Sequence, residues 1–196
     1  MQRPIPSTVL ANNWATIAQR GGLALFFSLV TPLRSDPSLA WFAPLFLFYA
    51  IADGVLAISA AARSVRSGER WACHLVEGLA GVCCVFLMCL WPDTSLRALT
   101  WTLASWATLT GIGALVNSAG LGKSATREFL AGALGVVLIR FGLLTIGAER
   151  AGEAGITRWA CGNALLIAVL FLAWGARLRA EQTGRPVAKL LQLRAR

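Results

Sequence analysis

The stretch SLAWFAPLFLFYAIADGVLAISAAARSVR, residues 38–66, decides the fold of this chain. Residues 38–62 are mostly apolar, and a basic cluster of Arg63 and Arg66 follows them. At a rise of about 1.5 Å per residue, a helix of this length reaches roughly 37 Å, which exceeds a hydrocarbon core of about 30 Å. The stretch therefore predicts a transmembrane helix. Because an unpaired carboxylate inside a bilayer is costly, Asp53 should be neutral, paired or next to a wet cavity.

The composition of the whole chain agrees with a membrane protein. Of its 196 residues 57% are hydrophobic and only 14% are charged, whereas soluble domains are about 25% charged. A soluble fold of this length would leave too much apolar surface in water. The chain is therefore expected to form one integral membrane domain.

Long apolar runs follow one another along the chain, separated by short polar turns. These runs are too long for barrel strands and lack an alternating pattern, so they predict helices. The predicted fold class is an all-α polytopic membrane protein with six transmembrane helices. The apolar runs cover residues 15–33, 38–62, 71–91, 95–121, 128–148 and 155–178.

An internal repeat groups these runs into three helical hairpins with a period of about 57 residues. SDPSLAW at 35–41 aligns without a gap with PDTSLRA at 92–98, and Gly21, Gly78 and Gly135 share one repeat position. Repeats with an even number of crossings run parallel, which predicts a pseudo-threefold arrangement about the membrane normal. The expected parts are a cytoplasmic N-terminal lead (1–13), a six-helix membrane domain (14–180; hairpins 14–70, 71–127 and 128–180) and a basic cytoplasmic tail (181–196).

The charges indicate an orientation. With the chain ends and the loops 63–70 and 122–128 on one side, that side carries the whole formal net charge of +9. The positive-inside rule then predicts that both termini are cytoplasmic. Anionic lipid headgroups at that face are the expected partners. The charge is spread along short loops next to the membrane, so no nucleic-acid partner is expected.

Three charged residues within the apolar runs are predicted to lie at a similar depth. Arg20 follows Trp14 by six residues and Glu77 follows Trp71 by six, so they share one repeat position, while Asp53 precedes Arg63 by ten. Arg20 can pair with Asp53, with Glu77, or with both. Such a cluster would have a net charge of −1 when all three groups are ionised, which makes it a candidate pH-sensitive site. The competing interpretation is a buried ion pair that only fixes helix register.

Three further polar residues lie within the apolar runs. His74 precedes Glu77 by one helical turn, nearer the interface, and could respond to pH near neutrality. Arg140 has no acid at its depth in the neighbouring runs. It is expected either to reach Asn163 and backbone carbonyls or to face a wet cavity. Glycines in the fourth and fifth runs permit close helix packing, with contact in a homo-oligomer as the second use.

No pattern of a catalytic or metal site is found. The chain lacks a phosphate-binding glycine loop, HExxH and GxSxG. The five cysteines and the single histidine show no ligand spacing, and Cys83, Cys84 and Cys89 are interpreted as buried packing residues. We therefore expect a protein that is not an enzyme and binds neither metal nor cofactor.

Four features carry a resemblance to a known family: a glycine-rich first helix, a turn near a proline, an Asp-Gly pair in the second helix, and a basic loop that ends at a tryptophan. In these features residues 14–180 resemble the HdeD-type acid-resistance proteins, which are bacterial inner-membrane proteins built from a short duplicated repeat. In the third hairpin, Glu149-Arg150-Ala151 replaces the turn proline. The matching residues are Arg20-Gly21-Gly22 and Glu77-Gly78, Asp36-Pro37 and Trp91-Pro92-Asp93, Asp53-Gly54, and Arg70-Trp71.

The resemblance implies a six-helix plasma-membrane protein associated with acid stress and brings no catalytic residues with it. The expected function is non-enzymatic support of acid or envelope stress tolerance through binding of protons, lipid or a partner. The alternative is a small transporter or channel whose ion or proton path passes Arg20, Asp53 and Glu77.

Overall fold

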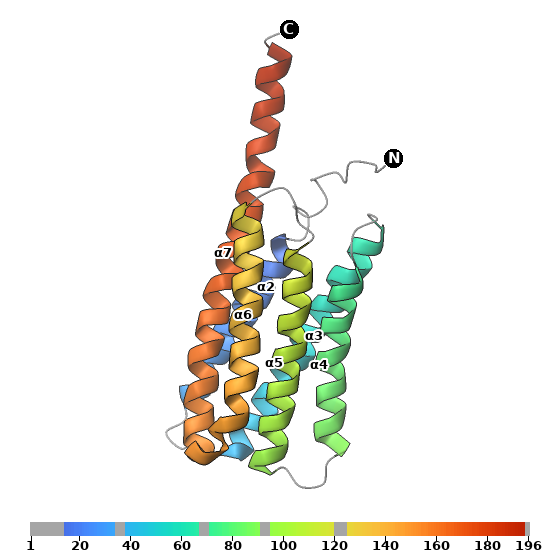
Figure 1. Ribbon diagram of the computed structural model, residues 1–196. Helices are drawn as coiled ribbons and strands as arrows, with labels where there is room; N and C mark the ends of the chain where they lie inside the picture. Colours follow the sequence, from blue (N-terminus) through green and yellow to red (C-terminus); the bar gives the residue numbers. More distant parts are fainter. Residues whose placement is uncertain (1–13, 34–37, 67–70, 91–94, 120–124, 195–196) are drawn as a thin grey trace.

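The structure, a computed structural model, describes residues 14–33, 38–66, 71–90, 95–119 and 125–194 (Figure 1). The described part consists of helices without a strand, which confirms the all-α prediction. The expected lead at 1–13, the turns around 34–37 and 91–94, and most of the expected loops lie outside the described residues. The α-helices are α2 (Trp14–Val30), α3 (Leu39–Arg66), α4 (Ala72–Leu90), α5 (Leu96–Ser118), α6 (Ala125–Gly147) and α7 (Gly152–Arg194), with 3-10 turns η1 (Thr31–Leu33) and η2 (Ala148–Ala151).

Five of these helices, α3 to α7, are long and apolar enough to cross a membrane. The chain is thus a multi-pass α-helical membrane protein. Helix α2 has 17 residues and a length of about 26 Å, somewhat short of a bilayer core. Helix α7 continues past the bundle to Arg194 (Figure 1), so residues 181–194 of the expected tail are helical.

Serines start two of the helices at matching positions of the repeat. The carbonyl of Ser38 accepts hydrogen bonds from the amides of Trp41 and Phe42 at the start of α3. Ser95 caps α5, because its hydroxyl accepts a hydrogen bond from the amide of Ala98 at 3.2 Å. Such a side chain satisfies a helix amide that has no partner within the helix. The aligned motifs of the sequence therefore correspond to two helix starts.

Glycines set the closest approaches between helices. A Cβ at Gly78 of α4 would lie 2.8 Å from the carbonyl oxygen of Gly54 in α3. A Cβ at Gly135 of α6 would lie 2.8 Å from the carbonyl oxygen of Gly111 in α5. A Cβ at Gly21 of α2 would lie 2.9 Å from a leucine side chain of α7. Small residues thus let α3 and α4, α5 and α6, and α7 and α2 pack with their backbones in close contact.

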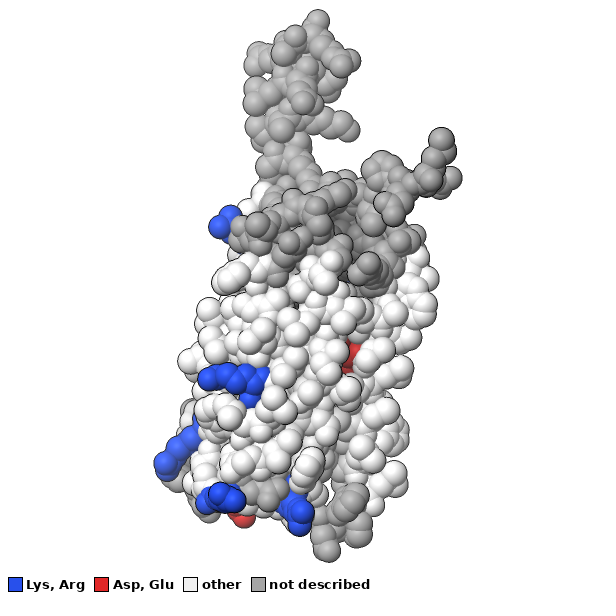
Figure 2. Space-filling model, viewed as in Figure 1, with Lys and Arg blue, Asp and Glu red and all other residues white. Residues whose placement is uncertain are grey.

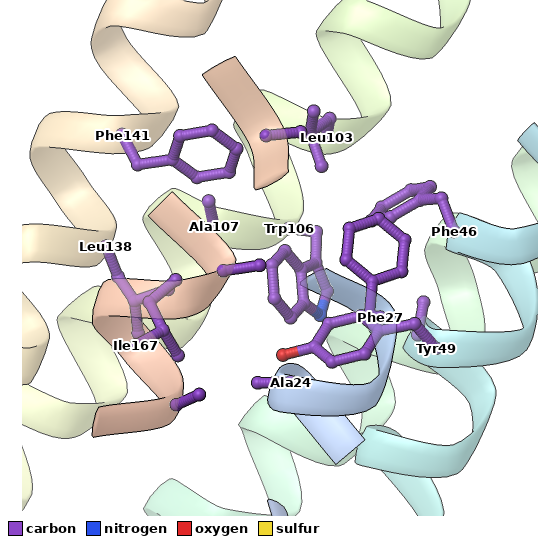
Figure 3. Packing of buried hydrophobic residues seen from close by; sticks show 14 of the residues in the cluster. Ala24, Phe27, Phe46, Tyr49, Leu103, Trp106, Ala107, Leu138, Phe141 and Ile167 are labelled. Atoms are coloured by element: carbon purple, nitrogen blue, oxygen red, sulfur yellow. The ribbon is translucent and has the colours of Figure 1, made fainter. Parts of the chain in front are cut away.

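Aromatic side chains fill the centre of the bundle (Figure 3). The ring centroids of Tyr49 and Trp106 are 5.4 Å apart with the planes nearly perpendicular, and Phe27 lies 5.2 Å from Tyr49. Phe46 packs edge-on against Trp106 at 5.9 Å. Edge-to-face pairs of this kind are the favoured arrangement of buried rings. The layer leaves a cavity of about 20 Å³ between these rings and α7.

The expected burial of three cysteines is partly wrong. Cys84 is buried and its thiol lies 3.8 Å from the carbonyl oxygen of Thr102, but Cys83 and Cys89 are exposed. Residues 83 and 84 point to different sides of α4 because successive helical positions differ by about 100°. A continuous apolar run does not reveal which of its positions face the bundle.

Candidate functional site

Arg20 is the centre of the site. Its side chain leaves α2 toward the bundle interior, and the residue is only 5% exposed. Nε donates a hydrogen bond to Oδ1 of Asp53 at 2.7 Å, and Nη2 donates to Oδ2 at 2.9 Å. This two-pronged geometry is the strongest arrangement between a guanidinium and a carboxylate. Asp53 of α3 is therefore paired.

Glu77 of α4 takes the remaining edge of the same guanidinium. Nη1 of Arg20 donates to Oε2 of Glu77 at 2.9 Å. The two pairings of Arg20 considered from the sequence thus occur together. One arginine faces two carboxylates, and the three residues, which we call the ionic cluster, have a net charge of −1 when all are ionised.

The local sequence explains why these side chains meet. Each member of the ionic cluster directly precedes a glycine, in the pairs Arg20-Gly21, Asp53-Gly54 and Glu77-Gly78. Gly54 and Gly78 are a point of backbone contact between α3 and α4. Because the backbones lie so close there, the short side chain of Asp53 reaches a guanidinium that it shares with Glu77.

Two neighbours of the ionic cluster were not predicted from the sequence. The ring of Phe171 in α7 lies 4.9 Å from Cζ of Arg20, a cation–π contact. Gly113 of α5 faces Glu77, since a Cβ there would lie 2.8 Å from Cγ and 2.9 Å from Oε1 of the glutamate. The glycines of the fourth run, Gly113 among them, had been interpreted as residues for helix packing or contact in an oligomer, and an aromatic residue in an apolar run carries no signal of cation binding.

His74 lies next to the ionic cluster, in the first turn of α4. Its Nδ1 lies 3.7 Å from Oε2 of Glu77, and its side chain is 21% exposed against 4% for Glu77. The spacing of one helical turn predicted this proximity. His74 is thus the more accessible titratable neighbour of Glu77.

Arg140 and Asn163 do not lie as either expectation described. Nδ2 of Asn163 donates to the carbonyl oxygen of Trp159 in its own helix at 2.9 Å, and its Oδ1 is buried without a hydrogen-bond partner in the described part of the chain. Arg140 is exposed on the outside of the bundle, with Cζ 5.8 Å from the Trp159 ring. Depth along a helix, the basis of both expectations, does not specify which way a side chain faces.

The chemistry available to the ionic cluster is ionic and protonic. Within the described ranges no group of three or more His, Cys, Asp or Glu side chains could hold a metal ion. Figure 2 shows an acidic surface at mid-height between apolar side chains. Two carboxylates that share one cation at a buried position can bind a proton, because protonation of one removes the uncompensated charge.

The fold and the ionic cluster define a multi-pass α-helical membrane protein with a buried, charged centre. A family model described as a short repeat of unknown function (DUF308) matches residues 76–147. This range runs from the first turns of α4 to the end of α6 and contains Glu77, but neither Arg20 nor Asp53. No curated protein and no solved structure matches the chain.

Proposed function

We propose that this chain is a non-enzymatic bacterial inner-membrane protein of the HdeD acid-resistance type, in which the ionic cluster acts as a pH-sensitive element. The observation that carries the proposal is the sharing of one guanidinium by Asp53 and Glu77 at 2.7 to 2.9 Å in a buried setting. The match to the short-repeat family supports the family assignment without extending over the whole chain.

The architecture that we propose comprises three repeated hairpins around a pseudo-threefold axis, with α2 as the sixth transmembrane helix. The glycine contacts support it. Gly54 contacts Gly78, and Gly111 contacts Gly135. Each residue of the second pair follows its counterpart in the first pair by 57 positions. A third contact joins α7 back to α2, as a closed ring requires. We place both termini in the cytoplasm by the positive-inside rule, with anionic lipid headgroups at that face.

Protonation of Glu77 is the proposed switching event. The charged and titratable groups that the described part of the chain places at its carboxyl are Arg20 from α2, Asp53 beyond that guanidinium from α3, and His74 from its own helix, and Gly113 of α5 also faces it. Asp53 already uses two of the guanidinium donors, so Glu77 is the acid with the weaker hold on Arg20. A neutral Glu77 would bind Arg20 less strongly, and the contact between α2 and α4 would loosen.

The aromatic layer argues against the alternative of a channel or transporter. The rings of Phe27, Phe46, Tyr49 and Trp106 pack on one another at centroid distances of 5.2 to 5.9 Å on the side of the ionic cluster away from His74. A conducting path would need a continuous polar route through this layer. Because the aromatic layer closes one side, the ionic cluster would exchange protons only through the side of His74. This arrangement suits a proton sensor better than a proton carrier.

Infrared spectroscopy of the protein in nanodiscs tests the switch. On acidification the wild type should gain a band at the frequency of a protonated carboxyl group that is shielded from water, and this band should be weaker in Glu77→Gln. Glu153→Gln, which alters an exposed acid of α7, serves as the matched control and should keep it. A wild type without the band, or a Glu77→Gln variant with an undiminished band, would contradict the switch.

Two physiological measurements separate the candidate functions. Survival of cells at low pH should fall with Glu77→Gln while the protein still folds and reaches the membrane. Proton or ion flux in proteoliposomes should be absent. Flux that depends on Asp53 and Glu77 would instead establish the transporter.

A further inference from the structure

We propose that Arg140 of α6 and Trp159 of α7 form a binding site for the phosphate of a membrane phospholipid. The site lies on the outer surface of the bundle and is separate from the ionic cluster.

The surroundings of Arg140 are those of a lipid-facing residue. Arg140 is exposed, although it lies within the apolar span Phe129–Gly147 of α6. Its neighbours on the same face, Val136 and Leu143, are 58% and 60% exposed. Figure 2 shows a basic side chain within the white, apolar band on the side where α6 and α7 lie. A cation in such a position needs a counter-ion, because hydrocarbon does not solvate it.

The described part of the protein supplies no acid for Arg140. Asp53 of α3 and Glu77 of α4 are buried and bind Arg20, and no ion pair of Arg140 is found among the described residues. What Arg140 contacts is the indole of Trp159, with Cζ 5.8 Å from the ring. An indole stabilises a guanidinium at its face and leaves the N–H groups at the edge of the guanidinium free to donate.

The depth of Arg140 matches the reach of a headgroup phosphate. It lies seven residues before Gly147, the end of α6, which corresponds to about 10 Å along the helix axis. Long basic side chains extend toward the interface while their stems stay in the apolar layer. Tryptophan is itself enriched at this boundary. The phosphate would come from the leaflet at the α6–α7 turn.

The surface beside Trp159 has room for a lipid. Gly162, one turn further along α7, is exposed, and a Cβ there would meet nothing within 4 Å. Gly147 at the end of α6 is equally open. An acyl chain can thus lie along this surface while the headgroup meets Arg140.

Charge complementarity favours a lipid over a second copy of the chain. A symmetric contact through this face would bring two Arg140 side chains together, and like charges repel. The exposed neighbours Val136 and Leu143 are apolar and carry no charge that could offset them. A phospholipid supplies the missing negative charge and covers the apolar neighbours at the same time.

Native mass spectrometry tests the site. The full-length protein is mixed with defined lipids in detergent, and the lipid that stays bound after the detergent is removed is measured. The wild type should retain phosphatidylglycerol or phosphatidylethanolamine and should not retain diacylglycerol, which has no phosphate. Arg140→Gln should lower the bound fraction about tenfold, the effect of losing a charge-assisted interaction. Arg140→Lys should be intermediate, because it keeps the charge but loses the two-pronged geometry.

Arg97→Gln is the matched control, since Arg97 is another exposed arginine, in the first turn of α5. It should bind phospholipid as the wild type does, and circular dichroism should show all variants folded. Equal binding by Arg140→Gln, equal retention of diacylglycerol, or displacement of the lipid by inorganic phosphate would overturn the proposal. Loss of a dimer in Arg140→Gln with unchanged lipid binding would also overturn it.

Discussion

Replacement of Arg20 by methionine should destabilise the protein strongly. The change removes three charge-assisted hydrogen bonds, at 2.7, 2.9 and 2.9 Å, from two buried carboxylates. At about 1.5–3 kcal/mol for each such bond, the upper limit of the loss is roughly 4–9 kcal/mol. Because the stranded acids can take up protons, we expect the smaller cost of about 3–5 kcal/mol that is typical of a broken buried ion pair.

Thermal unfolding in detergent micelles measures this loss, with the tryptophans as fluorescent reporters. For a chain of this length about 1 kcal/mol corresponds to roughly 2–4 °C, so the midpoint should fall by roughly 6–20 °C. Adding Asp53→Asn and Glu77→Gln to Arg20→Met should recover much of the difference, since neutral amides need no counter-ion. Arg97→Met at the protein surface should stay within about 0.5 kcal/mol of the wild type.

The pH dependence of the stability provides a second test of the Arg20→Met variant. At neutral pH Arg20→Met leaves two unbalanced carboxylates, and at lower pH these groups are protonated. The difference in stability between wild type and variant should therefore shrink on acidification. An unfolding midpoint within about 2 °C of the wild type at every pH would refute the reasoning, because the ion pairs would then contribute no net stability.

Four further substitutions test the packing of the helices. Gly113→Ala should destabilise the protein by about 1–3 kcal/mol, because its Cβ would overlap Glu77. Gly162→Ala, whose Cβ would meet nothing within 4 Å, should be neutral or stabilising by up to about 1 kcal/mol. Chemical unfolding in mixed micelles compares the two variants, and equal effects would count against the contact between Gly113 and Glu77. Gly142→Ala places a Cβ 2.7 Å from a backbone carbonyl of α5, so the midpoint should fall by several degrees in a thermal scan, and an unchanged scan would argue against close packing of α5 and α6. Asn163→Leu removes a buried oxygen, Oδ1, that has no hydrogen-bond partner in the described part of the chain, and it should be neutral or stabilising by about 1 kcal/mol. A clear loss of stability in the same assay would indicate that this oxygen is hydrogen-bonded.

Buried residues follow members of the ionic cluster at intervals of 57 residues. Thr110 and Ile167 occupy the positions that follow Asp53 at intervals of 57 residues, and both are buried. Leu134 likewise follows Glu77 at this interval and is buried. These positions are thus buried whether they carry a charged, a polar or an apolar residue. The ionic cluster forms where such buried positions of α2, α3 and α4 carry an arginine and two acids.

The amino-acid sequence by itself determined the class of the protein and the membership of the ionic cluster. Long apolar runs can satisfy their backbone hydrogen bonds in a bilayer only as helices, so the all-α fold followed from run length. The depths of Arg20, Asp53 and Glu77 followed from counting residues along these helices. Both inferences rest on the constant rise of an α-helix, which is a local property.

The rotation of each helix and the choice of its neighbours were decided only by the tertiary structure. Counting residues gave the place of Arg140 along its helix but not its position on the outer surface, because the direction of a side chain depends on how the whole bundle packs. It also could not reveal that Phe171 and Gly113 complete the surroundings of Arg20 and Glu77. Those contacts join residues that are distant in sequence, and they form because glycines let particular helix pairs approach closely.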